Sequence, residues 1–268
     1  MVFASLLRRF ARRHAVFVLA CAGLLGLFQL LLCAAVGSFD VSGALHSVLD
    51  SLPPMLQAFL STRLFGGMTP HGLLAFGWNH PITHAAGTAV AIVLGTRAIA
   101  GEAEAGLMEL HLAQPLARGT WLGSYVVFGA FALALVTTAG LAGTALGQRA
   151  FGLEPFPARD LLRLGLAYTS LQLAWFGVTL AFSAFGREAG RVSGAAFIVA
   201  LLSYFAEVIG GLWTRVAFVL PWSPHHHYAP QAILAQDGGL RGDIAWLGAV
   251  ALAGLALAAW RFAHRDLP

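Results

Sequence analysis

Six long apolar runs constrain this chain more than any other feature of its sequence. They lie near residues 15–36, 81–99, 121–146, 161–184, 192–212 and 243–262. A helix needs about 20 apolar residues to cross a hydrocarbon core of roughly 30 Å, and each run is close to that length or longer. Hydrophobic residues make up 58% of the chain and charged residues only 10%. We therefore predict an all-α integral membrane protein with six transmembrane helices, forming a single transmembrane domain over residues 1–268.

The basic residues indicate how the spans are oriented. All 16 are Arg, and they cluster at the ends of the apolar runs. If Arg8, Arg9, Arg12 and Arg13 are cytoplasmic, the same side also holds Arg97, Arg118, Arg187, Arg191, Arg261 and Arg265. The positive-inside rule favours this orientation, with both termini in the cytoplasm. Because topology explains the Arg clusters, the net charge of +4 does not indicate a nucleic-acid partner.

Two segments outside the spans have patterns of their own. Residues 1–14 alternate basic and apolar side chains at helical spacing, which predicts a helix in the cytoplasmic interface of the lipid bilayer. Residues 213–242 are apolar and aromatic but are interrupted by Pro221, Pro224 and Pro230. We predict that this external segment is re-entrant and forms two Pro-broken half-helices before the last span.

The absence of Lys excludes some chemistry. A P-loop needs a Lys on the nucleotide phosphates, and Schiff-base catalysis needs an amine. This chain can supply neither, so we predict that it is not an enzyme of those classes and holds no cofactor of its own.

A hydrophilic island lies between the second and third runs, at residues 96–118. It carries Glu102, Glu104 and Glu109, with Leu residues threaded between them. Such a segment does not cross a bilayer, yet it is too apolar to remain fully solvated. We predict a short amphipathic helix at the membrane face that docks on a partner.

The island also resembles a known family. The stretch GTRAIAGEAEAGLMELHLAQPLARGTWLGSYVV is similar to the signature of ATP-binding-cassette (ABC) type-2 permeases, which reads G-x-x-x-I-x-G-E-x-E-x-G-T-L-E-L-L-L-x-x-P-x-x-R. The matching positions are Ile99, Gly101, Glu102, Glu104, Gly106, Glu109, Leu110, Leu112, Pro115 and Arg118. The chain departs from the signature at Leu107, Met108 and His111. Ser223, Pro224 and Tyr228, and the ending at residues 262–267, are also similar to family patterns.

The resemblance implies the transmembrane permease subunit of a bacterial ABC exporter. Residues 97–118 would be a cytoplasmic coupling helix in a cleft of a separate ABC ATPase subunit, which would bind the ATP and Mg. Two permeases would form a homodimer with two ATPases in the plasma (inner) membrane, and the apolar spans suggest an amphipathic or lipid-like substrate. The residues assigned to ATPase coupling are Gly101, Glu102, Glu104, Gly106, Leu107, Glu109, Leu110, Leu112, Pro115 and Arg118. A second cytoplasmic contact is assigned to Arg187, Glu188 and Arg191, or these residues are only a topological anchor.

Small and ionisable residues in the spans give further candidates. Gly186, Gly190 and Gly194 recur every four residues, a spacing that permits close helix packing or a dimer contact. Ionisable groups within spans point to function, so Glu207 and His84 are candidates for the transport pathway. Glu207 could instead pair with Arg215.

The adjacent His225, His226 and His227 suggest a different function. External His residues could bind copper or zinc, as in an intramembrane His-dependent metalloenzyme or a metal-handling membrane protein. However, three adjacent His side chains on a regular element cannot all reach one ion. We therefore keep metal binding only as the alternative.

Overall fold

The computed structural model describes residues 2–38, 50–54, 57, 69–112, 116–234 and 240–265. It contains six helices long and apolar enough to cross a membrane, which confirms the all-α integral membrane fold. In chain order, these are α1 (Val2–Ser38), the continuous stretch Pro70–Glu104, α8 (Arg118–Ala150), α9 (Ala158–Phe185), α10 (Ala189–Leu212) and α12 (Leu240–His264). The stretch Pro70–Glu104 comprises α4 (Pro70–Asn79), α5 (Pro81–Thr96), η2 (Arg97–Gly101) and α6 (Glu102–Glu104).

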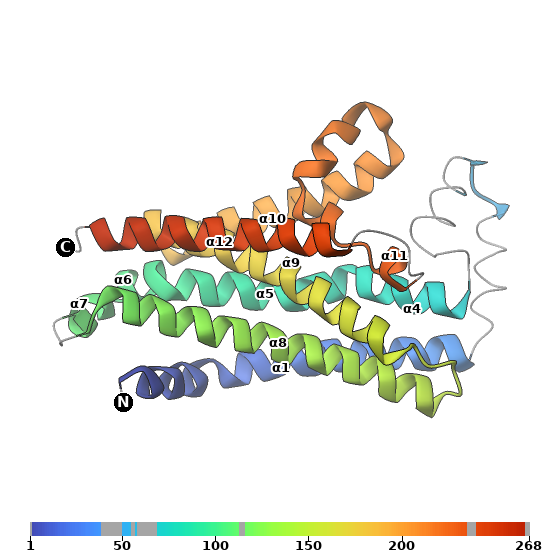
Figure 1. Cartoon of the computed structure of the whole chain (residues 1–268), viewed down its shortest axis with the longest axis horizontal. Coiled ribbons are helices and arrows are strands. Elements are labelled where there is room, and N and C mark those ends of the chain that lie inside the picture. Colours follow the sequence, from blue (N-terminus) through green and yellow to red (C-terminus); the bar gives the residue numbers. More distant parts are fainter. Residues whose placement is uncertain are drawn as a thin grey trace.

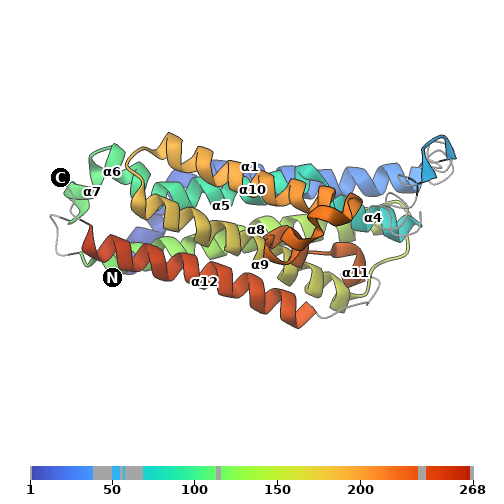
Figure 2. The same ribbon diagram turned by 90° about the horizontal axis from the view of Figure 1, so that it is seen from above.

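The long helices form one elongated bundle (Figure 1). Both chain ends lie at one end of the bundle together with α6 and α7 (Leu107–Leu112), and we call this the α7 end. Helix α4 and α11 (Pro230–Leu234) lie at the opposite end, the α4 end, and the view in Figure 2 agrees.

Glycines allow two close helix crossings. A Cβ on Gly143 of α8 would lie 2.1 Å from the carbonyl oxygen of Gly26 in α1. A Cβ on Gly254 of α12 would lie 2.4 Å from the carbonyl of Gly177 in α9. Since there is no room for a side chain at either crossing, these backbones touch directly, as small residues allow between helices in lipid.

The N-terminal helix is not a separate element. Residues predicted as an interfacial helix over 1–14 form the first turns of α1, which continues unbroken to Ser38. No Pro or Gly lies between Val2 and Gly23, so nothing in the sequence ends the helix there. With 37 residues, α1 is about 55 Å long and exceeds the bilayer core, which leaves its Arg-rich start beyond the core.

The segment before the last span differs from the two predicted half-helices. It forms the 3-10 helices η3 (Thr214–Trp222) and η4 (Pro224–His227), followed by the short α11. Pro221 lies inside η3, and Pro224 and Pro230 are the first residues of η4 and α11. Because Pro removes a backbone donor and blocks the preceding turn, a long regular α-helix does not form across the segment.

Candidate functional site

The hydrophilic island folds in two pieces instead of the single helix predicted across it. The second span continues through η2 and α6, a turn follows at Ala105 and Gly106, and α7 begins at Leu107. Gly106 has a φ of 66°, a left-handed conformation that favours glycine. The island is therefore the end of one span, a reverse turn and a short separate helix.

A serine from another span explains why η2 is a π-helix. The Ser183 hydroxyl donates to the Thr96 carbonyl at 2.9 Å and accepts from the Ala100 N–H at 2.8 Å. It thereby stands between two groups that would bond each other in an α-helix, and such an insertion widens the turn. The indole N–H of Trp121 donates to the Ala98 carbonyl at 2.8 Å. The end of the second span is thus fastened to α9 and to α8.

Glu102 is buried inside the chain. Its side chain has 0% exposure and forms an ion pair with Arg13 of α1, whose side chain is 34% exposed. A buried carboxylate needs such a partner, because desolvating an unpaired charge is costly. The sequence assigns Glu102 to ATPase coupling, but in the structure its carboxylate pairs with Arg13 and holds the second span against the first.

Glu104 is exposed but also has an internal role. One carboxylate oxygen accepts from the backbone N–H of Ala189 at 2.8 Å, at the first residue of α10. The N-cap residue of α10, Glu188, makes no capping bond with its own side chain. A carboxylate at a helix N-terminus satisfies an unpaired donor and complements the helix dipole. Glu104 therefore links the island to the fifth span.

Arg118 fastens the last span at this same end. Its guanidinium donates to the carbonyls of Phe262 and Arg265, both at 2.7 Å, at the end of α12. Arg265 in turn donates to the Ala184 carbonyl at 3.1 Å, at the end of α9. Two Arg side chains thus satisfy carbonyls that helix ends leave unpaired.

The outward surface of the island is on α7. Met108 is 1% exposed and anchors the helix, whereas Leu110 is 63% exposed. Glu109 and Gly106 are also exposed, and Leu107 is half-buried. Pro115 and the side chain of Leu112 lie outside the described residues. We call the exposed pair Glu109 and Leu110 the α7 face.

The turn between α9 and α10 lies beside the island. Glu188 and Arg191 form an exposed ion pair at 2.8 Å, and Arg187 is also exposed. The three candidate glycines separate into two groups. A Cβ on Gly186 would lie 2.2 Å from a methyl of Val192, so its small size serves packing within the chain, whereas Gly190 and Gly194 face open space.

The candidate pathway residues lie toward the α4 end. Glu207 contacts His226, with 2.9 Å between Oε2 and Nδ1, a partner that the sequence did not indicate. His84 is buried, and its Nε2 lies 3.1 Å from the side-chain oxygen of Asn79. The His84 ring centroid lies 4.9 Å from that of His225 and 5.6 Å from that of Tyr228.

The three adjacent His residues have different partners. His225 contacts the Ser203 hydroxyl at 2.9 Å, and His227 contacts Asp243 at 2.8 Å, while His226 faces Glu207. Burial, reinforced by the nearby His84 ring, holds the pKa of His225 well below its usual value. Among the described residues, no group of three or more His, Cys, Asp or Glu side chains is placed to hold a metal. The three adjacent His rings thus contact three different partners in the described chain.

Comparison with known proteins identifies the family. The profile of the family described as "ABC-2 family transporter protein" matches residues 12–267. No curated protein and no solved structure matches the chain. The family is one of membrane-bound permeases that work with an ABC ATPase. With nearly the whole chain covered, including the island and all six spans, this protein belongs to the ABC-2 transporter family and is a transmembrane subunit of an ABC transporter.

Proposed function

We propose that this chain is the permease subunit of a bacterial exporter and that the α7 face receives the push of a separate ATPase. The proposal is supported mainly by an exposed acidic and apolar pair, Glu109 and Leu110, on a segment that makes polar contacts with several spans. An ATPase cleft with a basic rim and an apolar floor would complement this pair.

The polar contacts of the island suggest how a movement of α7 would reach the other spans. Glu102 connects the island to α1, and Glu104 connects it to the start of α10. Ser183 connects it to α9 through the η2 turn. A displacement of α7 would therefore reach three other spans through short polar contacts, as a rocking transition between inward- and outward-open states requires.

The motor would be another chain. The sequence has no Lys for a P-loop, so ATP and Mg would bind the partner ATPase. In this arrangement both termini and the α7 end are cytoplasmic, in the bacterial inner membrane. The Arg residues near the start of α1 support that orientation.

A homodimer is supported by the exposure of α10. Within the chain, 22% of the apolar stretch of α10 is buried, against 72% for α9 and 11% for α12. Large side chains on the open surface of α10 include Phe197, Ile198, Leu202 and Phe205. Since Gly190 and Gly194 also face open space, a second copy could pack closely there and form the transport path between the two permeases. An amphipathic or lipid-like substrate fits a path built from apolar spans.

Co-purification with the ABC ATPase of the same transporter tests the proposal. We expect wild-type chain to retain the ATPase in detergent, and both Glu109→Arg and Leu110→Asp to reduce retention and substrate-stimulated hydrolysis at least about tenfold, as loss of a central interface contact does. Glu154→Arg is the matched control, because Glu154 is exposed at the α4 end. Normal retention in both α7 variants would disprove coupling through the α7 face.

A further inference from the structure

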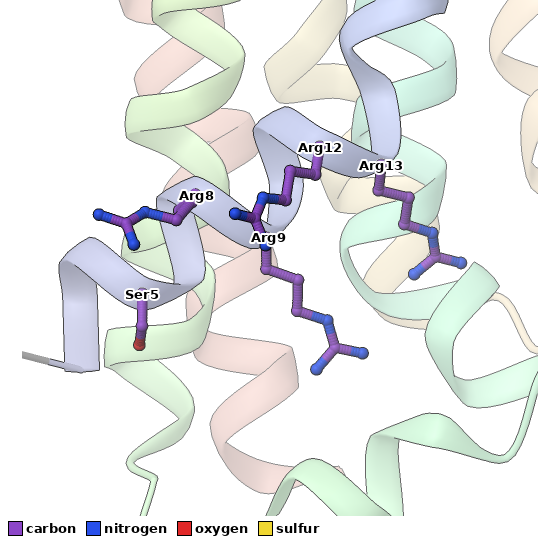
Figure 3. A pocket seen from close by; sticks show the side chains of 5 residues that line it. All are labelled: Ser5, Arg8, Arg9, Arg12 and Arg13. Atoms are coloured by element: carbon purple, nitrogen blue, oxygen red, sulfur yellow. The ribbon is translucent and has the colours of Figure 1, made fainter.

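Two hollows lie next to each other along α1. The first has a volume of about 430 Å³ and is lined by Ser5, Arg8, Arg9, Arg12 and Arg13 (Figure 3). The second, about 150 Å³, is an apolar groove between α1 and α8. Its lining includes Ala15, Val18, Leu19, Phe128, Phe131 and Leu135.

One face of α1 carries residues of both hollows. Arg8, Arg12, Ala15 and Leu19 are spaced by four, three and four residues, which places them on one side of α1. From Arg12 to Leu19 the helix rises about 10 Å. Two residues of the cationic hollow therefore lie in line with two residues of the apolar groove, in the direction in which α1 enters the spans.

Two of the Arg side chains that line the first hollow are not balanced by an acidic residue within the described chain. Arg13 pairs with Glu102, and Figure 3 shows Arg9 and Arg13 extending to one side while Arg8 and Arg12 extend to the other. Arg8 and Arg12 are exposed and have no acidic partner within the described residues. Two neighbouring guanidinium groups suit a phosphate, which they can bind through paired hydrogen bonds.

We propose that this face of α1 binds one anionic phospholipid, with its phosphate on Arg8 and Arg12 and an acyl chain along the groove against α8. A lipid explains both hollows, because its charged headgroup and its apolar chain are joined in the same order along the helix. An acidic segment of the ATPase would use only the first hollow. The site is independent of the proposed coupling at the α7 face.

Native mass spectrometry of the full chain tests this site. The chain is purified in detergent with equal amounts of phosphatidylglycerol and phosphatidylcholine that carry the same acyl chains. We expect phosphatidylglycerol to be retained preferentially, and Arg8→Gln and Arg12→Gln each to weaken its retention about fivefold. The pair Arg149→Gln and Arg159→Gln, exposed Arg residues toward the α4 end, should change nothing.

A second variant keeps the test decisive if removing Arg alters insertion. Ala15→Trp fills the groove without changing charge, and we expect it to reduce phosphatidylglycerol retention while the ATPase stays bound. Equal retention of the two lipids, full displacement by inorganic phosphate, or normal retention in Ala15→Trp would overturn the proposal. Loss of the ATPase with unchanged lipid binding in the Arg8→Gln variant would assign the hollow to the ATPase instead.

Discussion

The two ends of the bundle are held together by different chemistry. At the α7 end, charged side chains cross between helices: Arg13 to Glu102, Glu104 to the start of α10, and Arg118 to the end of α12. At the α4 end, buried contacts without a carboxylate hold the segment before the last span, including the His225 contact with Ser203 and the Tyr228 hydroxyl, which donates to the Trp78 carbonyl at 3.1 Å. Two part-exposed His–carboxylate contacts, His226 with Glu207 and His227 with Asp243, lie beside them.

This difference has a mechanical meaning. Charged contacts at helix ends join elements that can shift as units, because each contact fixes a point and not a surface. The His and Tyr contacts sit among packed rings, where a shift would disturb many neighbours at once. The contacts at the α7 end can therefore transmit movement between helices, whereas the packing at the α4 end holds the external segment rigidly.

The largest expected effect comes from breaking the buried pair at the α7 end. Arg13→Gln removes an ion-pair partner of a carboxylate with 0% exposure. Loss of one member of a fully buried pair costs about 3–5 kcal/mol. Because Arg13 is 34% exposed, we expect a smaller loss of about 2 kcal/mol in the free energy of unfolding in detergent.

A double-mutant cycle with Glu102→Gln isolates this contact. The double variant should recover part of the loss, since it removes both charges. Strictly additive losses would show that the two side chains do not stabilise each other.

The next effect concerns the π-helix. Ser183→Ala removes the hydroxyl that satisfies two buried backbone groups of the second span. We expect a loss of about 1–2 kcal/mol, the cost of an unsatisfied buried polar group. Ser193→Ala is the control, because Ser193 bonds only to carbonyls of its own helix. Equal stability of the two variants would contradict the assigned role of Ser183.

The α4 end should respond to acid. Because the pKa of His225 is lowered in the folded protein, the unfolded chain takes up the proton first as pH falls. Stability that is present above a pH of about 6.5 should therefore decrease on acidification, by at most about 1.4 kcal/mol per pH unit.

Thermal unfolding between pH 7.5 and 5 measures this slope. His225→Asn should flatten it, and His264→Gln, at the exposed end of α12, should leave it unchanged. A slope that is the same in all three proteins would assign the acid response to other groups.

The smallest expected effect on stability is at Glu104. Glu104→Gln keeps a hydrogen-bond acceptor for Ala189 but removes the charge at the helix N-terminus. Because the carboxylate is exposed and screened, we expect a loss of a few tenths of a kcal/mol. Glu109→Gln should not change the free energy of unfolding and should instead weaken ATPase retention. Loss of ATPase retention in Glu104→Gln together with loss of stability in Glu109→Gln would contradict both assigned roles.

The sequence predicts the spans well, because hydropathy is a local property. It also identifies the island, whose charge density differs from its surroundings. It does not reveal that Glu102 is buried, since Arg13 lies 89 positions away and charge alone cannot indicate burial. The turn at Gly106 was visible only as a glycine, and the π-helix depends on Ser183, which belongs to a span with no special pattern of its own.

The glycine crossings reduce the number of parts that can move separately. Where the backbones of α1 and α8 touch at Gly26 and Gly143, no layer of side chains is left to shear, and the same is true of α9 and α12 at Gly177 and Gly254. Each pair of helices should move as one rigid body. Together with α5 and α10, the six spans then form four rigid bodies. Conformational change in this transporter should therefore occur at the interfaces between these four bodies.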